Sequence, residues 1–297
     1  MAEPVPVNGS LSSSALEPSS TQGSKVWLRF WRNPAAIIGM TLMLILLAVA
    51  VLAPWISGDP NVIDTAKRLK PPSGENLLGT DQLGRDVWAR VAHGASISLR
   101  IGFLVTTISV LIGVTVGLFA GSLGNAWDNA LMRVTDIFFA FPGLILAMAI
   151  AAALGPSLEN AIIAVALVNW PSYARLVRAQ VLALREREFV EAARALGSNN
   201  TRIAWKHLLP NALQPVLIQA SFDIGSAILT AAGLSFIGFG AQPPIPEWGA
   251  TVSLTRSYIS NAPWASSAPA IAILVSVLAF NLIGDALRDA LDPRAAR

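Results

Sequence analysis

The stretch AAIIGMTLMLILLAVAVLAPWI, residues 35–56, decides the fold class of this chain. It carries no charged residue, and a helix needs about 20 mostly apolar residues to cross the hydrocarbon core of a bilayer. The whole chain has the same character, since 54% of its 297 residues are hydrophobic and only 13% are charged. A soluble domain has about 25% charged residues. The sequence therefore predicts an integral membrane protein.

The N-terminal residues differ from this apolar run. Residues 1–24 are rich in Ser, Pro and Gly and have no apolar period, which predicts a disordered tail. A signal peptide would begin with basic residues and continue into a short apolar run. Here the first basic residue is Lys25, and the run that follows is long enough to span the membrane. We therefore expect an uncleaved first transmembrane helix, with residues 25–297 forming the transmembrane domain.

Further apolar runs follow the first one along the chain. Two of them are short, but each can gain a turn from its flanks. Together they predict an all-α fold with six transmembrane helices and both termini on the same side of the membrane. The predicted spans lie at about 35–56, 101–123, 137–154, 161–177, 213–239 and 269–287.

The distribution of Lys and Arg sets the orientation, because cytoplasmic loops carry an excess of these residues. With the N-terminus inside, the 21 Lys and Arg residues divide fourteen inside to seven outside. The region from Arg175 to Lys206 holds seven of the inside residues and decides the result. We therefore expect this region and both termini to be cytoplasmic.

The chain lacks the motifs of several catalytic classes. Cys is absent and the only histidines, His93 and His207, lie far apart, which argues against a metal site. No lysine follows a glycine, so a phosphate-binding loop is absent. A serine nucleophile elbow and an HExxH zinc helix are also missing. We therefore expect a non-catalytic chain without a metal or cofactor of its own.

Small residues recur every four positions in the second predicted span, at Ser109, Gly113, Gly117 and Gly121. Such a stripe lets another helix approach its backbone closely. Packing inside the bundle is favoured over a role in lining a transport pathway.

Asp223 lies in the middle of the fifth predicted span, beside Gln219 and Ser226. A charge in hydrocarbon costs at least ~2.5 kcal/mol on insertion scales, so this carboxylate should face a water-filled path or a partner helix. Path lining and structural pairing stay open at this point. Near the cytoplasmic end of the third span, Arg133 and Asp136 are expected to form a solvated ion pair.

A polar helical hairpin, FVEAARALGSNNTRIAWKHLLP at residues 189–210, interrupts this apolar chain. Gly197 supplies the left-handed conformation that ends many helices, and the following Asn residues can cap a second helix. Pro210 is expected to mark where the chain turns back into the membrane. Two helices around a glycine turn resemble a DNA-binding motif, but tethering beside a bilayer argues against groove entry. A plain solvated loop and a docking element for another protein are the alternatives.

This hairpin resembles the EAA motif in permease subunits of bacterial ABC importers. The matching residues are Glu191, Ala192 and Ala193, then Gly197, then Leu209 and Pro210; His207 departs from the pattern, which often has Ile there. Beyond the hairpin, the chain after residue 28 resembles the dipeptide/oligopeptide/nickel permease family, specifically its second permease subunit. Four motifs carry this resemblance: LLGTDQLGRDVWAR (77–90), RVTDIFFAFPG (133–143), GAQPPIPEWGA (240–250) and NLIGDALRDALDP (281–293).

The resemblance implies a type I ABC importer permease in a bacterial cell (inner) membrane. Such a subunit pairs with a second, homologous permease, and two cytoplasmic ATPase subunits supply ATP hydrolysis with their own ATP and Mg. An extracytoplasmic binding protein delivers the substrate. The hairpin would then be a cytoplasmic coupling helix seated on an ATPase, with Glu191, Ala192, Ala193, Arg194, Gly197, Leu209 and Pro210 as the docking residues.

The long first outer loop fits delivery of substrate by a binding protein. A self-capped turn with an Asp–Arg pair is the favoured local role of its motif, and contact with the binding protein is the functional alternative. The motif residues are Gly79, Thr80, Asp81, Gly84, Arg85 and Asp86.

The substrate expected from the resemblance is a dipeptide or short oligopeptide. Glutathione, nickel chelates and another small solute are the alternatives within the same class. The competing class is a membrane protein that acts alone, either a secondary transporter or an intramembrane enzyme. A secondary transporter would be expected to show internal repeats with broken helices, and the sequence shows none.

Overall fold

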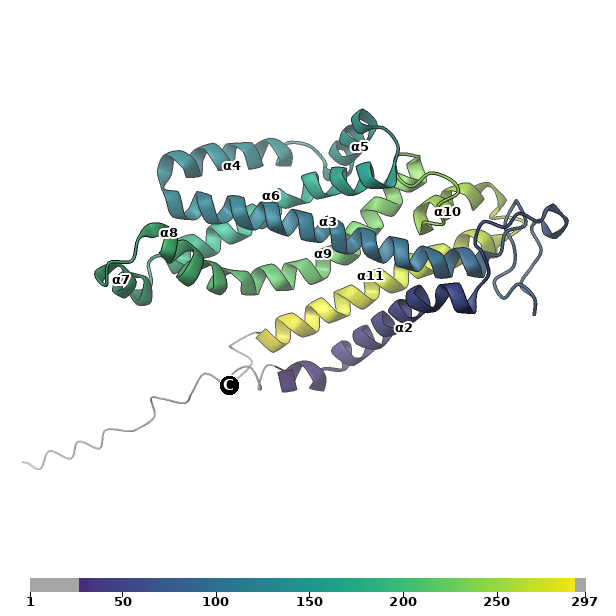
Figure 1. Cartoon of the computed structure of the whole chain (residues 1–297), viewed down its shortest axis with the longest axis horizontal. Helices are drawn as coiled ribbons and strands as arrows, with labels where there is room; N and C mark the ends of the chain where they lie inside the picture. Colours follow the sequence, from purple (N-terminus) through teal and green to yellow (C-terminus); the bar gives the residue numbers. More distant parts are fainter. Residues whose placement is uncertain (1–26, 292–297) are drawn as a thin grey trace, which may run out of the picture.

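The computed structural model describes residues 27–291, which form an all-α bundle (Figure 1). The predicted tail at residues 1–24 lies outside the described residues. A short helical segment covers residues 27–32. The elements that follow are α2 (Pro34–Ile56), η1 (Thr65–Lys67), α3 (Val87–Leu123), α4 (Asn125–Phe139), α5 (Gly143–Leu154), α6 (Leu158–Leu184), α7 (Glu188–Ala195), α8 (Asn200–Ile203), η2 (Ala204–Leu208), α9 (Leu209–Ile237), α10 (Trp248–Thr255), η3 (Arg256–Tyr258) and α11 (Pro263–Leu291).

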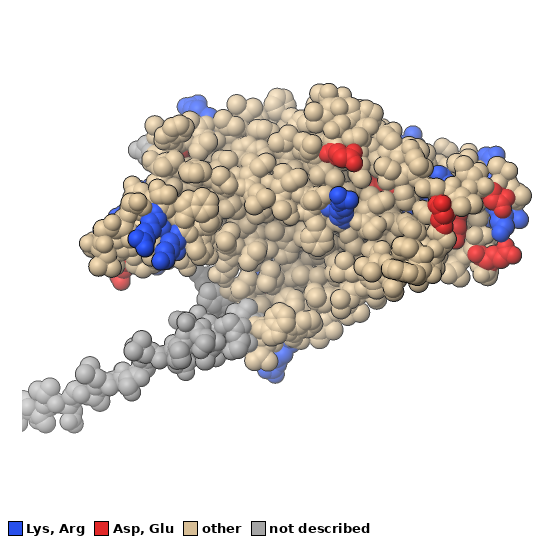
Figure 2. Space-filling view, in the orientation of Figure 1, with Lys and Arg blue, Asp and Glu red and all other residues tan. Residues whose placement is uncertain are grey.

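The long helices run side by side along the long axis of the molecule. In Figure 1 the α7–α8 hairpin lies at one end, together with the start of α2 and the end of α11. The loop before α3 and the short α10 lie at the other end. The charged side chains visible in Figure 2 gather mostly toward these two ends and leave few charges between them. An apolar girth between two polar ends is the arrangement that a bilayer requires.

Four helices in the described part of the chain are long and apolar enough to cross a membrane: α2, α3, α11 and the continuous helical run from residue 200 to 237. A fifth crossing is available if the bent pair α4 and α5 counts as one span. The predicted third span, residues 137–154, therefore falls across a bend of 91° between these two helices. The predicted fourth span lies within α6, which is not among the four. A count of six spans stays a prediction.

The small-residue stripe of α3 packs against α6, which confirms the packing role. A Cβ on Gly121 would lie 2.6 Å from Val181 Cγ1, and one on Gly117 would overlap the carbonyl oxygen of Ala174. Ser109 Oγ donates to the carbonyl of Ala166 across the same contact at 3.1 Å. Because the stripe has no bulky side chain, the two backbones approach closely.

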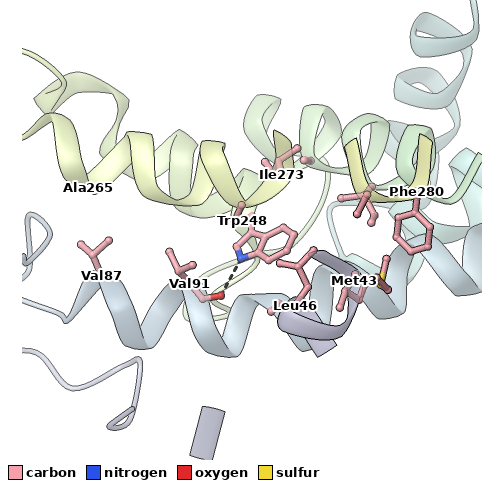
Figure 3. Close-up of a cluster of buried hydrophobic side chains, with 14 residues drawn as sticks. Met43, Leu46, Val87, Val91, Trp248, Ala265, Ile273 and Phe280 are labelled. Atoms are coloured by element: carbon pink, nitrogen blue, oxygen red, sulfur yellow. Dashed lines mark hydrogen bonds between the residues drawn. The ribbon is translucent and has the colours of Figure 1, made fainter. Parts of the chain in front are cut away.

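The bundle core is closed at the end opposite α7 by α10. Trp248 is 1% exposed, and its indole Nε1 donates to the carbonyl of Val91 on α3 at 3.0 Å (Figure 3). Glu247 caps α10 with both carboxylate oxygens, each 2.8 Å from a backbone nitrogen, those of Gly249 and Ala250. These contacts hold the α10 segment inside the bundle, although it is far from α3 in the sequence.

The motif of the outer loop forms a self-capped turn, as its favoured local role predicted. Asp81 Oδ2 accepts from Arg85 Nε at 2.6 Å, and Asp81 Oδ1 accepts from the backbone nitrogens of Leu83 and Arg85. Gly84 has a φ of +75°, a conformation that glycine adopts at little cost. Asp86 caps α3 through the backbone nitrogen of Trp88 at 2.9 Å. The motif thus shapes the loop and starts the second long helix.

Candidate functional site

The hairpin predicted at residues 189–210 begins with α7, which starts at Glu188 and ends in a Schellman motif. Gly197 has a φ of +81°. The backbone nitrogen of Ser198 donates to the carbonyl of Ala193 at 3.0 Å, and that of Gly197 donates to Arg194 at 2.9 Å. This pair of bonds satisfies carbonyls that would otherwise be left free at the helix end. Asn199 then caps α8 by accepting from the backbone nitrogen of Arg202 at 2.8 Å.

One side of α7 is buried against the bundle. Val190 is 0% exposed and Ala193 is 7% exposed, and both join a cluster that includes Tyr173, Val177 and Leu208. Ala193 was predicted to dock on a partner, but its side chain holds the helix on its own bundle. The cluster fixes how α7 sits on the ends of the long helices.

The outward side of α7 carries apolar side chains in contact with solvent. Phe189 is 42% exposed and Leu196 is 88% exposed, with the exposed Ala192 between them on the same face. Glu191 is also exposed. A solvated loop has no physical need for such a face, because exposing large apolar groups to water is unfavourable. The face is suited to contact with another protein.

The chain does not turn at Pro210, which corrects one expectation. Helix continues from α8 through η2 into α9, and Pro210 occupies the first turn of α9. η2 is a π-helical turn immediately before it. Proline has no backbone N–H to donate to the preceding turn of a helix. The wider π-helical turn before Pro210 lets the helix continue without that hydrogen bond. Leu209 is half-buried against the cluster that holds α7.

A cavity of about 240 Å³ opens between the hairpin and the turn from α3 to α4. Two arginines line it from different elements, Arg185 after α6 and Arg194 on α7. Arg185 Nη1 donates to the carbonyl of Gly121 at 3.3 Å. Arg194 was predicted as a docking residue, and the structure places it at this cavity. The remaining lining residues are Gly121, Ser122, Leu123, Gly124, Asn200, Ile203 and Leu208.

A polar stripe runs along α9 through the predicted path residues. Gln219 Nε2 donates to Asp223 Oδ1 at 2.9 Å, and Ser226 follows on the same helical face. Gln219 and Ser226 are exposed, and Asp223 is half-buried. The hydroxyl of Tyr173 on α6 is buried and has no hydrogen-bond partner within the described residues. Gln219 lies on the same helix as Asp223, and no ion pair joins Asp223 to another helix within residues 27–291.

Ion pairs between α4 and α6 replace the expected pairing of Asp136 with Arg133. Asp136 Oδ1 accepts from Arg175 Nη2 at 2.6 Å, and Asp128 Oδ2 accepts from Arg178 Nη2 at 2.6 Å. The guanidinium of Arg175 also lies 3.9 Å from the ring centre of Phe139. These contacts join segments about 40 to 50 residues apart, so local spacing could not reveal them.

The predicted outer-loop residues lie mostly inside the loop. Gly79, Thr80, Asp81, Gly84 and Arg85 are buried, and Asp86 is half-buried. The exposed side chains around them are Leu77 and Leu83. These two residues were not singled out from the sequence, and their apolar character next to a polar motif was the available signal.

An all-α bundle with few charges along its girth, a long structured loop at one end and a helical hairpin at the other defines a multi-spanning membrane protein. Comparison with known protein families identifies the family of the chain. Residues 113–297 match the family described as binding-protein-dependent transport system inner membrane component. Residues 21–72 match the N-terminal transmembrane domain of oligopeptide transport permease C. The chain belongs to the first of these families, and the resemblance read from its motifs is confirmed.

Individual relatives agree with this placement. The chain is 46% identical over 264 residues to the dipeptide transport system permease protein DppC of Alkalihalophilus pseudofirmus, covering 89% of this chain and 87% of that protein. It is 41% identical to the glutathione transport system permease protein GsiD of Pectobacterium atrosepticum, with 92% of each chain covered. An inward-facing structure of the MetNI methionine ABC transporter matches 68% of this chain and 97% of its own, at 22% identity and a TM-score of 0.56. That structure supports the fold.

Proposed function

We propose that this chain is the permease subunit of an ABC importer that moves dipeptides or short oligopeptides into the cytoplasm. The observation that carries the proposal is the α7 hairpin, which presents Phe189, Ala192 and Leu196 outward while Val190 and Ala193 anchor it to the bundle. An importer whose ATP is hydrolysed by separate subunits needs such a lever. The dipeptide permease relative supports the substrate class.

In this proposal two ATPase subunits hydrolyse ATP with bound Mg, and one of them receives α7 in a surface cleft. Glu191 and Ala192 contact that cleft together with Phe189 and Leu196, while Gly197 sets the angle at which α7 leaves the bundle. Movement of α7 is transmitted to α9, because η2 joins the hairpin to this helix without a break. Leu209 and Pro210 lie at that junction.

The second permease covers the exposed polar stripe of α9, and the two subunits enclose the path. Facing lipid would be costly for Gln219, Asp223 and Ser226, so the stripe is assigned to the path side of the helix. At the opposite end, the outer loop receives the binding protein through exposed residues such as Leu77 and Leu83. The binding protein selects between a dipeptide and glutathione. Glutathione is the substrate given in the name of a related permease.

The function is tested by reconstituting the chain in liposomes with its second permease, its two ATPases and its binding protein. We expect uptake of a labelled dipeptide that requires all components and ATP. Uptake driven by an ion gradient with this chain alone would contradict the proposal. Competition by unlabelled glutathione at equal concentration measures the substrate preference, and stronger competition by glutathione than by a dipeptide would reassign the substrate.

Docking of α7 is tested with Leu196→Glu in the same system. A buried carboxylate in an apolar cleft is costly, so the purified complex should lose its ATPases. The matched control is Ile259→Glu, because Ile259 is 57% exposed and lies next to η3, in the segment that joins α10 to α11. Retention of ATPases by the Leu196 variant at the level of the control would remove α7 from the docking site.

A further inference from the structure

The cavity beside the hairpin has the composition of an anion site. Arg185 and Arg194 reach it from two elements, and Asn200 adds an amide donor. α4 begins directly after Gly124, which lines the cavity, and no side chain caps this helix start. Free backbone N–H groups at a helix start also favour a negative charge. Two arginines, an asparagine and an uncapped helix start thus border one cavity.

Neighbouring carboxylates do not neutralise the two arginines. Within the described residues, Arg185 has one acidic partner, Glu186, at 3.4 Å, and that carboxylate is 79% exposed. Such an exposed pair is screened by water and contributes little to holding the arginine. No ion pair of Arg194 is found among residues 27–291. Asp128, the acid in the first turn of α4, is paired with Arg178, and Asp136 further along α4 is paired with Arg175.

Exposed apolar residues occur in the segment that lines the cavity. Leu123 lines it and is 53% exposed, and Trp127, three residues after the lining Gly124, is 63% exposed. Tryptophan is enriched where a bilayer meets water. These two apolar side chains make no favourable contact with a free inorganic anion. The acyl chains of a lipid, in contrast, can pack against them.

We propose that this cavity binds the headgroup phosphate of an anionic phospholipid, with Arg185 and Arg194 as its ligands. The planar guanidinium fork suits phosphate oxygens. Because Arg194 belongs to α7 and Arg185 follows α6, the bound phosphate joins the hairpin to the long helices through a lipid of the surrounding membrane. This site is separate from the outward face of α7 and does not depend on the transported substrate.

The site is tested by native mass spectrometry of the full chain in detergent, titrated with phosphatidylglycerol or phosphatidylcholine. We expect tighter binding of phosphatidylglycerol. The double change Arg185→Gln and Arg194→Gln should weaken it at least about tenfold, since hydrogen bonds to charged groups are stronger than those between neutral groups. The matched control removes two other positive charges of the hairpin, Arg202→Gln and Lys206→Gln, and should stay within about twofold of the wild-type affinity. An equal loss in the control would show diffuse charge attraction and overturn the proposal.

Two further arms separate the alternatives. Inorganic phosphate at the lipid concentration should not displace phosphatidylglycerol, and full displacement would rule out a lipid site. Addition of the partner ATPases should leave the lipid bound, and its release would assign the arginines to protein contact. Should the double variant misfold, Asn200→Asp places a repelling carboxylate at an exposed position of the cavity, and unchanged affinity in this variant would also overturn the proposal.

Discussion

At the residue scale, Gly197 sets the angle between α7 and α8, because it adopts a backbone conformation that ends α7. Its φ of +81° lies in the left-handed region, where a residue with a Cβ pays roughly 1–2 kcal/mol. No atom lies within 4 Å of the place a Cβ would take, so the cost of a substitution is conformational and not steric. The sequence predicted this turn because the preference of glycine depends on the backbone of one residue.

Replacing Gly197 with Val should therefore uncouple ATP hydrolysis from uptake while membrane insertion survives. A β-branched residue disfavours the left-handed conformation, so α7 leaves the bundle at a different angle. ATP hydrolysis and dipeptide uptake measured on one reconstituted preparation give the coupling ratio. The control is Gly197→Asn, since Asn tolerates this conformation. Coupled uptake at the wild-type rate in the Val variant would refute the lever role.

Asp223 is a second position where one residue decides between two roles. Asp223→Asn keeps the shape and removes the charge, and uptake per folded complex should fall by about tenfold if the carboxylate contacts the solute. Thermal stability should change little. The matched control is Asp59→Asn, an exposed acid of the outer loop. A loss of stability with unchanged uptake would instead make Asp223 a structural residue.

At the scale of helices, the contact between α3 and α6 organises one half of the bundle. Its small-residue stripe is visible in the sequence because the four-residue spacing places these positions on one helical face. The sequence does not identify the partner helix, because any neighbouring helix could pack against the small residues of the stripe. The bend between α4 and α5 was likewise missed, since both halves are apolar and the predicted span ran through the break.

The close approach makes Gly117→Ala a sensitive change. Its Cβ would overlap the carbonyl oxygen of Ala174, and overpacking costs about 1–3 kcal/mol. Thermal unfolding of the purified chain in detergent should shift to lower temperature. Gly233→Ala is the control, because nothing lies within 4 Å of its added methyl group and alanine favours a helix. Equal midpoints for the two variants would argue against tight packing at this contact.

At the scale of the whole molecule, the two ends of the bundle are predicted to lie in different compartments. The α7 hairpin shares one end with the start of α2 and the end of α11, and the outer loop lies at the other (Figure 1). The excess of Lys and Arg assigns the hairpin end to the cytoplasm. This assignment is open to a direct test because the chain contains no cysteine.

Single cysteines at Leu77 and Leu196 should therefore label from opposite sides. Leu77 is 63% exposed in the outer loop and Leu196 is 88% exposed on α7. A membrane-impermeant maleimide should modify the Leu77→Cys variant in right-side-out vesicles and the Leu196→Cys variant only in inverted vesicles. Detergent-solubilised protein, in which both should react, serves as the control. The reverse labelling pattern would invert the topology.

The sequence by itself determined the membrane class, the all-α fold, the permease family and the local turns at Gly197 and Asp81. The membrane class, the fold class and the turns follow from composition or from residues within a few positions of one another, where backbone preference and helical period act directly. The family followed from the resemblance of five motifs to a known pattern. Tertiary structure alone decided that Asp136 pairs with Arg175, that Ala193 is buried, and that Arg185 and Arg194 share one cavity. Those outcomes depend on which distant segments pack together, and that packing is settled by the fit of whole helix surfaces.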